Sequence, residues 1–440
     1  MASFTLSELL TATGGVLYAP PDFACDGVTD VSIDTRTLKA GALYVPIRGD
    51  VFDGHRFIAD AFAKGAALTL SETPCDAPHI RVADCVRAYQ DIARLHRMRF
   101  SIPVVCITGS VGKTTTKDLV TAVLRQSYRT HSTRGNLNNQ TGVPTTVLQL
   151  DASDQASVME LGTNHFGEID AIARVARPTV CLFTNIGEAH IEFFGSREGI
   201  FRGKTEMLAH LVPGGSVIVN GDDDLLCTLS PAITYGLREG VDVRGTNLCE
   251  HGLAGVSFCA EVQGRSLPIR LAVSGRHMVS NALAAIAVGV LLGVPDEKIQ
   301  AALASFSPTA GRTDITQTSR FTLIDGTYNC NPTSMEAALH VLQNAAGRRV
   351  CIFGDMLELG AQSPAYHARI GTLAKACGVD LLLCVGPLAA HATDVAAHRF
   401  PDLDALHAAL PALLLDGDTI LVKASQGMHL SRTVAFIKAM

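Results

Sequence analysis

The feature that most constrains the fold is the segment 104–116, Val-Val-Cys-Ile-Thr-Gly-Ser-Val-Gly-Lys-Thr-Thr-Thr. Its apolar start predicts a short buried strand, its two glycines predict a turn, and Lys-Thr-Thr predicts the first turn of a helix. A strand that runs through such a turn into a helix offers backbone N–H groups and a partial positive charge to an anion. The segment therefore predicts a nucleotide-phosphate site, made by Gly109, Ser110, Gly112, Lys113, Thr114 and Thr115.

This loop departs from the usual P-loop at one position. That pattern has a glycine five residues before Gly112, where this chain has Ile107. The lysine and the first threonine keep their expected places. Lys113 can reach the outer phosphates, and the Thr114 hydroxyl is placed to touch a magnesium ion.

The rest of the chain alternates strands and helices. Strands are expected at 42–47, 104–108, 157–160, 180–184, 216–219, 321–325, 349–353, 381–385 and 419–422, and helices at 57–64, 89–100, 282–294 and 428–439. Residues 237–272 differ, because short alternating stretches there indicate a small antiparallel excursion. We expect an α/β protein with a central doubly wound, mostly parallel sheet, a C-terminal Rossmann-like open sheet and a smaller N-terminal α/β domain.

Length and composition set the scale and exclude some classes. At 440 residues, 47% of them hydrophobic, the chain is too long for one core, and we expect domains at 1–100, 101–310 and 311–440. A net charge of −6 without a basic run disfavours nucleic acid as the main partner. No stretch reaches the ~20 apolar residues that a membrane helix needs, and the N-terminus lacks a leader pattern. The twelve cysteines form no C-x-x-C pair, which is typical of buried thiols in a reducing cytoplasm.

Polar residues follow several of the predicted strands. Glu160 and His190 come after two of them, and with Thr114 they supply a carboxylate, an imidazole and a hydroxyl for magnesium. Taken singly, Glu160 could cap a helix or pair with a lysine, and His190 could be a hydrogen-bonded core residue. Lys204 alone reads as a solvated surface lysine. Asn136, Asn138 and Asn139 are typical of a turn or of a substrate contact.

Together these segments resemble the Mur ligase family of bacterial cell-wall synthesis. The matching motifs are Thr-Gly-Ser-Val-Gly-Lys-Thr-Thr at 108–115, Gly-Asn-Leu-Asn-Asn at 135–139, Glu-Leu-Gly at 160–162, Thr-Asn-Ile-Gly-Glu-Ala-His at 184–190, Gly-Arg-His-Met-Val-Ser-Asn-Ala at 275–282, Tyr-Asn-Cys-Asn-Pro at 328–332 and Gly-Asp-Met-Leu-Glu-Leu-Gly at 354–360. The shortened phosphate loop is the form that this family uses. The last two motifs favour the branch that adds D-alanyl-D-alanine to UDP-N-acetylmuramoyl-tripeptide.

The resemblance implies a role for each site residue. Lys113 would bind the ATP γ-phosphate, Thr114, Glu160 and His190 would hold Mg²⁺, and Lys204 would be carbamylated to orient a second magnesium. Residues near the nucleotide would be His277, Asn281, Arg312, Asn329 and Asn331. Substrate contacts would come from Asp34, Thr35, Arg36, His55, Asn138, Asn139, Tyr328, Lys423 and Ser425. We expect a monomeric cytoplasmic enzyme.

The last block departs from the family pattern. Asp325-Gly326 stands where two acidic residues are usual, Lys423-Ala424-Ser425-Gln426 replaces Lys-Gly-Ser-Arg, and Ser431 replaces a later glutamate. Since this block would bind the amine, two alternatives stay open. One is a ligase of the same type with a different amine, and the other is a non-catalytic nucleotide-binding homologue.

Overall fold

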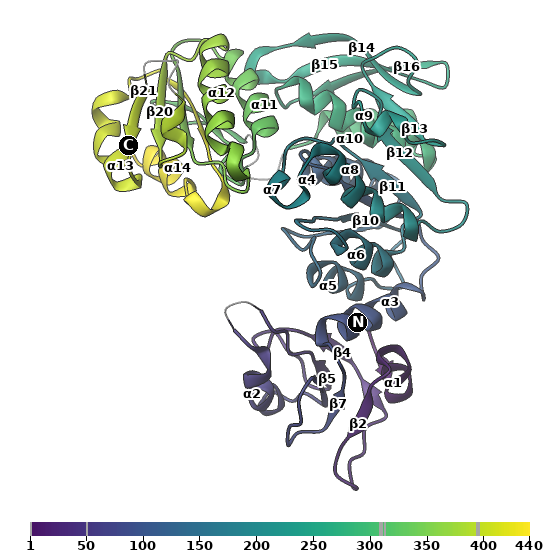
Figure 1. Ribbon diagram of the computed structural model, residues 1–440. Coiled ribbons are helices and arrows are strands. Elements are labelled where there is room, and N and C mark those ends of the chain that lie inside the picture. The colour runs from purple at the N-terminus through teal and green to yellow at the C-terminus, as the bar shows by residue number, and fades with distance from the viewer. Residues whose placement is uncertain (1, 50–51, 308–310, 312–313, 393–396) are drawn as a thin grey trace. The chain divides into compact units, whose positions relative to one another are not determined.

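The computed structural model describes residues 2–49, 52–307, 311, 314–392 and 397–440 (Figure 1). It divides into two compact units, each made of several segments of the chain. The first comprises Met1–Cys106, Tyr128–Cys181 and Thr205–Gly215. The second comprises Ile107–Ser127, Leu182–Lys204 and Ser216–Met440.

The N-terminal part of the first unit is a small α/β layer. Its five-stranded sheet has the order β2-β7-β6-β5-β4, formed by Val16–Tyr18, His79–Arg81, Leu68–Ser71, Ala42–Tyr44 and Asp30–Ser32. Only β2 runs antiparallel to its neighbour. A separate pair joins β1 (Phe4–Thr5) to β3 (Gly27–Val28). The helices are α1 (Leu6–Thr13), α2 (Ile58–Ala63) and α3 (Cys85–Arg97), with a 3₁₀ turn at Gly54–Phe57.

A nine-stranded sheet follows, in the order β16-β15-β14-β13-β12-β11-β8-β10-β9. Its strands are β8 (Val104–Thr108), β9 (Thr130–Ser132), β10 (Ala156–Glu160), β11 (Val180–Phe183), β12 (Ser216–Asn220), β13 (Ile233–Gly236), β14 (Val243–Glu250), β15 (Val256–Val262) and β16 (Arg265–Leu271). Every residue of β8 is buried, as expected for a continuous apolar strand covered on both faces. The last three strands form the antiparallel excursion.

Helices and short turns connect these strands. They are α4 (Lys113–Leu124), α5 (Gly142–Leu148), α6 (Glu168–Ala176), α7 (Ile191–Phe194), α8 (Arg197–Thr205), α9 (Arg276–Leu291) and α10 (Asp296–Ala304), with 3₁₀ turns at Glu206–His210, Leu226–Thr228 and Gly252–Ala254. Helix α9 is buried on nearly every side, which explains its run of Ala, Val and Leu.

The C-terminal part of the second unit is an open six-stranded sheet. Its order is β17-β18-β22-β19-β20-β21, formed by Asp314–Gln317, Thr322–Asp325, Thr419–Lys423, Arg349–Gly354, Leu381–Val385 and Ala397–Phe400. Only β17 is antiparallel. The helices are α11 (Pro332–Gln343), α12 (Ser363–Ala376), α13 (Leu403–Leu413) and α14 (Ser431–Lys438), with 3₁₀ turns at Gly360–Gln362, Ala389–His391 and Gln426–Met428.

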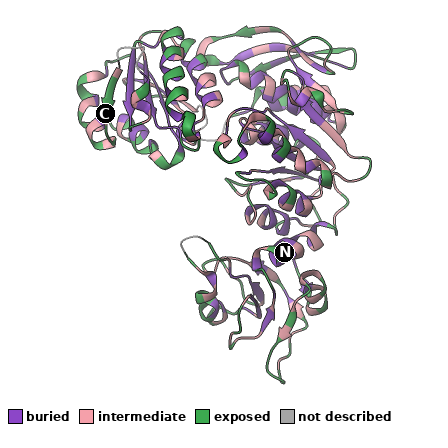
Figure 2. Ribbon diagram, in the orientation of Figure 1, coloured by how far each residue is buried: buried purple, intermediate pink, exposed green. Residues whose placement is uncertain are grey.

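Helices cover both faces of this sheet. Along β19, Cys351 and Phe353 point to a core shared with α11 and α12, while Val350 and Ile352 point to one shared with α13 and α14. Figure 2 shows the central strands as buried and the outer helix faces as exposed. The arrangement is the doubly wound open sheet that the sequence predicts.

The predicted fold class is therefore confirmed, and the errors concern the ends of elements. The strand expected at 42–47 spans only Ala42–Tyr44. The helix expected at 89–100 spans Cys85–Arg97, because the Asp84 side chain accepts the Arg87 N–H and caps it early. The helix expected at 282–294 already begins at Arg276. The one expected at 428–439 begins at Ser431, because a 3₁₀ turn precedes it. Among the described residues, no helix is long and apolar enough to cross a membrane.

Candidate nucleotide and ligation site

The phosphate loop lies between β8 and α4, as predicted. Gly112 is the residue before α4 and has φ 80°, and Gly109 has φ 155°. A side chain at Gly109 would collide with the Thr184 hydroxyl. Both glycines are therefore required, one by a close approach and the other by a backbone conformation that few other residues adopt.

The segment that follows β11 holds this loop in place. The Asn185 side-chain oxygen accepts the Val111 N–H at 3.0 Å, and its backbone oxygen accepts the Ser110 N–H at 2.9 Å. The Thr184 hydroxyl donates to the Val111 carbonyl at 2.7 Å. Ser110 in turn accepts the Gly187 N–H at 2.9 Å. These bonds hold the loop in a defined conformation. Thr184 and Asn185, which lie in the 184–190 motif, were not among the predicted site residues.

Two lysines lie near this loop in the second unit. The Lys113 ammonium donates to the Gly109 carbonyl at 2.8 Å and to the Ser110 carbonyl at 3.3 Å. Lys204, near the end of α8, is only 1% exposed, so the reading of a solvated surface lysine is wrong. Burial, together with the positive charge of Lys113, lowers the pKa of Lys204 well below its usual value. A buried amine with a lowered pKa thus lies near the phosphate loop.

The remaining metal candidates are distributed over both units. Thr114 is 5% exposed and stands in the first turn of α4. His190 precedes α7, and its Nδ1 lies 2.6 Å from a carboxylate oxygen of Glu358. In the first unit, Glu160 ends β10 with 2% exposure and accepts a hydrogen bond from the Asn138 amide at 2.8 Å. No cluster of three or more His, Cys, Asp or Glu side chains suited to a metal occurs in the described part of the chain.

Asn139, the residue after Asn138, has a structural role in its own loop. The Asn139 side-chain oxygen accepts the N–H groups of Thr141 and Gly142, the latter at 2.8 Å. It therefore shapes the turn before α5, which is the ordinary role of an asparagine in such a loop.

Helix α9 contributes two of the predicted nucleotide residues. The Asn281 side-chain oxygen accepts from the Thr116 hydroxyl at 3.2 Å, and a Cβ at Gly112 would lie 2.8 Å from it. Asn281 therefore packs against the phosphate loop. Burial, with the positive charge of Lys423 and His340, lowers the pKa of His277 to about 4, so this imidazole is neutral at pH 7.

Predicted residues of the last block gather at the carboxyl ends of β18, β19 and β22. The Lys423 ammonium donates to the Asn329 carbonyl at 2.7 Å, and the Ser425 hydroxyl donates to the Cys330 carbonyl at 3.3 Å. Ser425 also accepts the Leu357 N–H at 2.9 Å. Asn331 caps α11 by accepting the Ser334 N–H.

Two other residues complete this block. The Tyr328 N–H donates to the Gly311 carbonyl at 3.2 Å. Arg312 lies outside the described residues. The other predicted residues of the last block thus lie where parallel strands of an open sheet end, which is where ligands usually bind.

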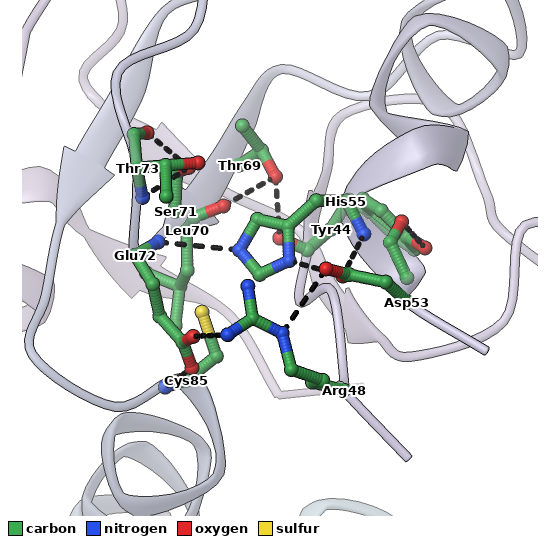
Figure 3. A network of polar contacts seen from close by, with 11 residues as sticks. Tyr44, Arg48, Asp53, His55, Thr69, Leu70, Ser71, Glu72, Thr73 and Cys85 are labelled. Atoms are coloured by element: carbon green, nitrogen blue, oxygen red, sulfur yellow. Dashed lines mark hydrogen bonds and ion pairs between the residues drawn. The ribbon is translucent and has the colours of Figure 1, made fainter. Parts of the chain in front are cut away.

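The N-terminal candidates form two groups in the first unit. Asp34 accepts bonds from the Arg36 guanidinium at 2.8–3.1 Å, and the Thr35 hydroxyl bonds to Asp60. Figure 3 shows the His55 ring between Asp53 and the backbone of Glu72. Its Nδ1 lies 2.6 Å from Asp53, and its Nε2 accepts the Glu72 N–H at 3.2 Å, so the hydrogen is on Nδ1.

Arg48 extends the second group and was not predicted. It bonds to Asp53 at 3.0 Å and lies 3.6 Å from Glu72, whose other oxygen accepts the Cys85 N–H (Figure 3). Hydrogen bonds from the His55 backbone N–H and the His55 side chain, with a further one from Arg48, lower the pKa of Asp53 to about 2. Arg48 stands close to the Asp53-Gly54-His55 motif, the one local signal that could have identified it.

Comparison with known proteins identifies a family to which this chain is similar along most of its length. Family models described as the Mur ligase middle domain, the Mur ligase glutamate ligase domain and the Mur ligase family catalytic domain match residues 107–289, 311–426 and 27–98. Curated UDP-N-acetylmuramoyl-tripeptide–D-alanyl-D-alanine ligases are similar over nearly their whole length. The protein from Synechocystis sp. is 39% identical, covering 94% of this chain and 92% of its own, and that from Escherichia coli is 37% identical, covering 99% and 98%.

Solved structures agree. A MurF structure from Acinetobacter baumannii aligns with a TM-score of 0.92 at 32% identity, covering 100% of this chain and 99% of the other. A MurF ligase from Thermotoga maritima in complex with ADP aligns with a TM-score of 0.86 at 25% identity, covering 94% and 97%.

Proposed function

The chain belongs to the Mur ligase family, and from this we propose that it joins D-alanyl-D-alanine to UDP-N-acetylmuramoyl-tripeptide in peptidoglycan synthesis. It is an ATP-dependent ligase that forms an amide bond. The observation that carries the proposal is the glycine-bracketed loop with Lys113 folded against it and the buried Lys204 beside it.

The reaction has two steps. The tripeptide carboxylate attacks the γ-phosphorus of ATP, which releases ADP and gives an acyl phosphate. The amine then attacks the acyl carbon, an amide bond forms, and inorganic phosphate leaves together with a proton. The protein contributes positioning and charge rather than a nucleophilic side chain. Lys113 would exchange its two carbonyl partners for γ-phosphate oxygens and stabilise the charge that develops there.

Two of the candidate metal residues carry oxygen donors, the ligand type that magnesium prefers. They are the Thr114 hydroxyl, in the first turn of α4, and the Glu160 carboxylate, at the end of β10. Both residues are buried. We assign Thr114, Glu160 and His190 as the residues that would hold Mg²⁺. When bound, Mg²⁺ offsets the negative charge of the phosphates.

Lys204 is suited to carbamylation. Its lowered pKa raises the neutral fraction of the amine, and a neutral amine adds to CO₂ to give a carbamate with loss of one proton. The carbamate would carry a negative charge next to Lys113, which favours it electrostatically. We therefore propose that Lys204 is carbamylated and helps to orient a second magnesium.

The remaining predicted site residues are assigned to the nucleotide or to the substrates. His277, Asn281, Arg312, Asn329 and Asn331 would surround the nucleotide, and Asp34, Thr35, Arg36, His55, Asn138, Asn139, Tyr328, Lys423 and Ser425 would contact the substrates. We propose domains at 1–100, 101–310 and 311–440, and each family model falls within one of them. We further propose a cytoplasmic monomer. The free state of all twelve cysteines agrees with a reducing compartment.

The identity of the amine is the part to test. The Ala424 methyl, where the family usually has glycine, would lie 2.7 Å from a Cβ at Gly354, so it fills space at the carboxyl end of β19. The experiment supplies ATP, UDP-N-acetylmuramoyl-tripeptide and a panel of amines, and measures phosphate release and product mass. We expect one phosphate per product carrying the added D-alanyl-D-alanine. Turnover with another amine alone would refute the assignment, and no turnover with any amine would favour a non-catalytic homologue.

A further inference from the structure

The segment 187–190, which follows β11, makes two contacts with the last block inside the second unit. The first uses Glu188. One of its oxygens accepts from the Thr333 hydroxyl at 2.8 Å, and the other lies 3.8 Å from the Arg369 guanidinium. The backbones come close because position 187 is glycine, where a Cβ would lie 2.6 Å from the Thr333 hydroxyl oxygen. This end of the segment is therefore anchored.

The second contact joins His190 to Glu358 and has an unusual backbone at both ends. His190 has φ 61° and Glu358 has φ 63°, the left-handed region that residues with a Cβ rarely adopt. Such conformations persist where surrounding interactions hold them and are frequent at functional sites. Here the backbones present the two side chains to each other, with Nδ1 of His190 2.6 Å from Oε2 of Glu358.

The chemistry of this contact determines which nitrogen of His190 can bind a cation. A carboxylate oxygen only accepts, so the hydrogen of a neutral imidazole is on Nδ1 and the lone pair is on Nε2. A histidine that ligates a metal commonly has its other ring N–H held by a carboxylate in this way. We propose that Glu358 is a positioning residue that fixes the tautomer and ring orientation of His190, so that Nε2 faces the nucleotide-bound divalent cation. The proposal rests on the proposed function.

The cation ligand and the residue that orients it come from different parts of the chain. The cation ligand belongs to the block that carries the phosphate loop, whereas its orienting carboxylate belongs to the motif 354–360 at the end of β19. Ser425 accepts a hydrogen bond from the residue before Glu358, so this carboxylate is tied to the predicted amine-binding loops as well. Removing Glu358 should weaken cation binding without removing any cation ligand.

The first test reads the tautomer directly. Nitrogen-15 spectra of the full chain, recorded up to alkaline pH, distinguish a protonated from an unprotonated ring nitrogen, and His190→Asn assigns the signals. We expect His190 to have its hydrogen on Nδ1 in the wild type. In Glu358→Ala the population should move toward the Nε2–H form, and in Glu358→Gln, whose amide oxygen still accepts, it should remain on Nδ1.

The second test measures Mg²⁺ affinity by calorimetry with ADP present. Glu358→Ala should weaken Mg²⁺ binding by about 10- to 100-fold, with partial rescue in Glu358→Gln. The matched control is Glu192→Gln, which neutralises an exposed carboxylate two residues from His190 and should change neither readout. Unchanged tautomer and affinity in Glu358→Ala would overturn the proposal. Neither readout needs turnover, so an inactive wild type would refute the proposed function and leave the role of Glu358 intact.

Discussion

At the scale of single residues, the site depends on where side chains are missing as much as on where they are present. Gly109 leaves room for the Thr184 hydroxyl, which in turn holds the loop through Val111. We expect Gly109→Ala to destabilise the fold by about 2–4 kcal/mol, since the new methyl overpacks a buried site and strains the backbone. ATP turnover should fall at least tenfold because the loop must move.

The control for this substitution is Gly135→Ala. Gly135 also has a positive φ, but no atom lies within 4 Å of the position of its Cβ. It should lose only about 1–2 kcal/mol, the ordinary cost of a left-handed residue. Urea unfolding and ATP turnover of both variants give the comparison. Equal effects at the two positions would show that the contact with Thr184 does not matter.

At the scale of elements, Asn331 at the start of α11 can have a structural role, a binding role or both, and two substitutions distinguish them. Asn331 caps this helix, and the Ser334 side chain bonds back to the Asn331 N–H. Asn331→Ala should lower the free energy of unfolding by about 1 kcal/mol, whereas Asn331→Ser, also a good cap, should retain it. If Asn331 also contacts the nucleotide, both variants should bind ADP more weakly. ADP affinity equal to wild type in Asn331→Ser would limit this residue to capping.

At the scale of the whole molecule, ligand binding should raise the free energy of unfolding. ADP at 100 times its dissociation constant should raise the free energy of unfolding by about 2.7 kcal/mol. Lys113→Ala should lose most of this gain, because the lysine is the cation nearest the phosphate loop along the chain. Lys298→Ala, an exposed lysine that bonds to the Gln126 carbonyl, should retain it. Thermal unfolding with and without ADP measures both, and an equal ADP response in Lys113→Ala would contradict the assignment.

The same scale shows what the sequence could and could not predict. The phosphate loop and the sheet strands were predicted because their signals are local: apolar runs, glycines and a lysine–threonine pair. The burial of Lys204 was missed, since its neighbours in sequence are charged and only packing removes it from water. The links from Asn185 to Val111 and from His190 to Glu358 span 74 and 168 residues, so no local pattern contains them.

The interleaving of the two units has a consequence for how the chain can be made and divided. Neither unit is one continuous stretch of sequence: the first is complete only at Gly215, after two segments of the second have already been passed. A single proteolytic cut or terminal truncation therefore releases neither unit whole. During synthesis at roughly 5–20 residues per second, the last segment of the first unit leaves the ribosome several seconds after residue 106.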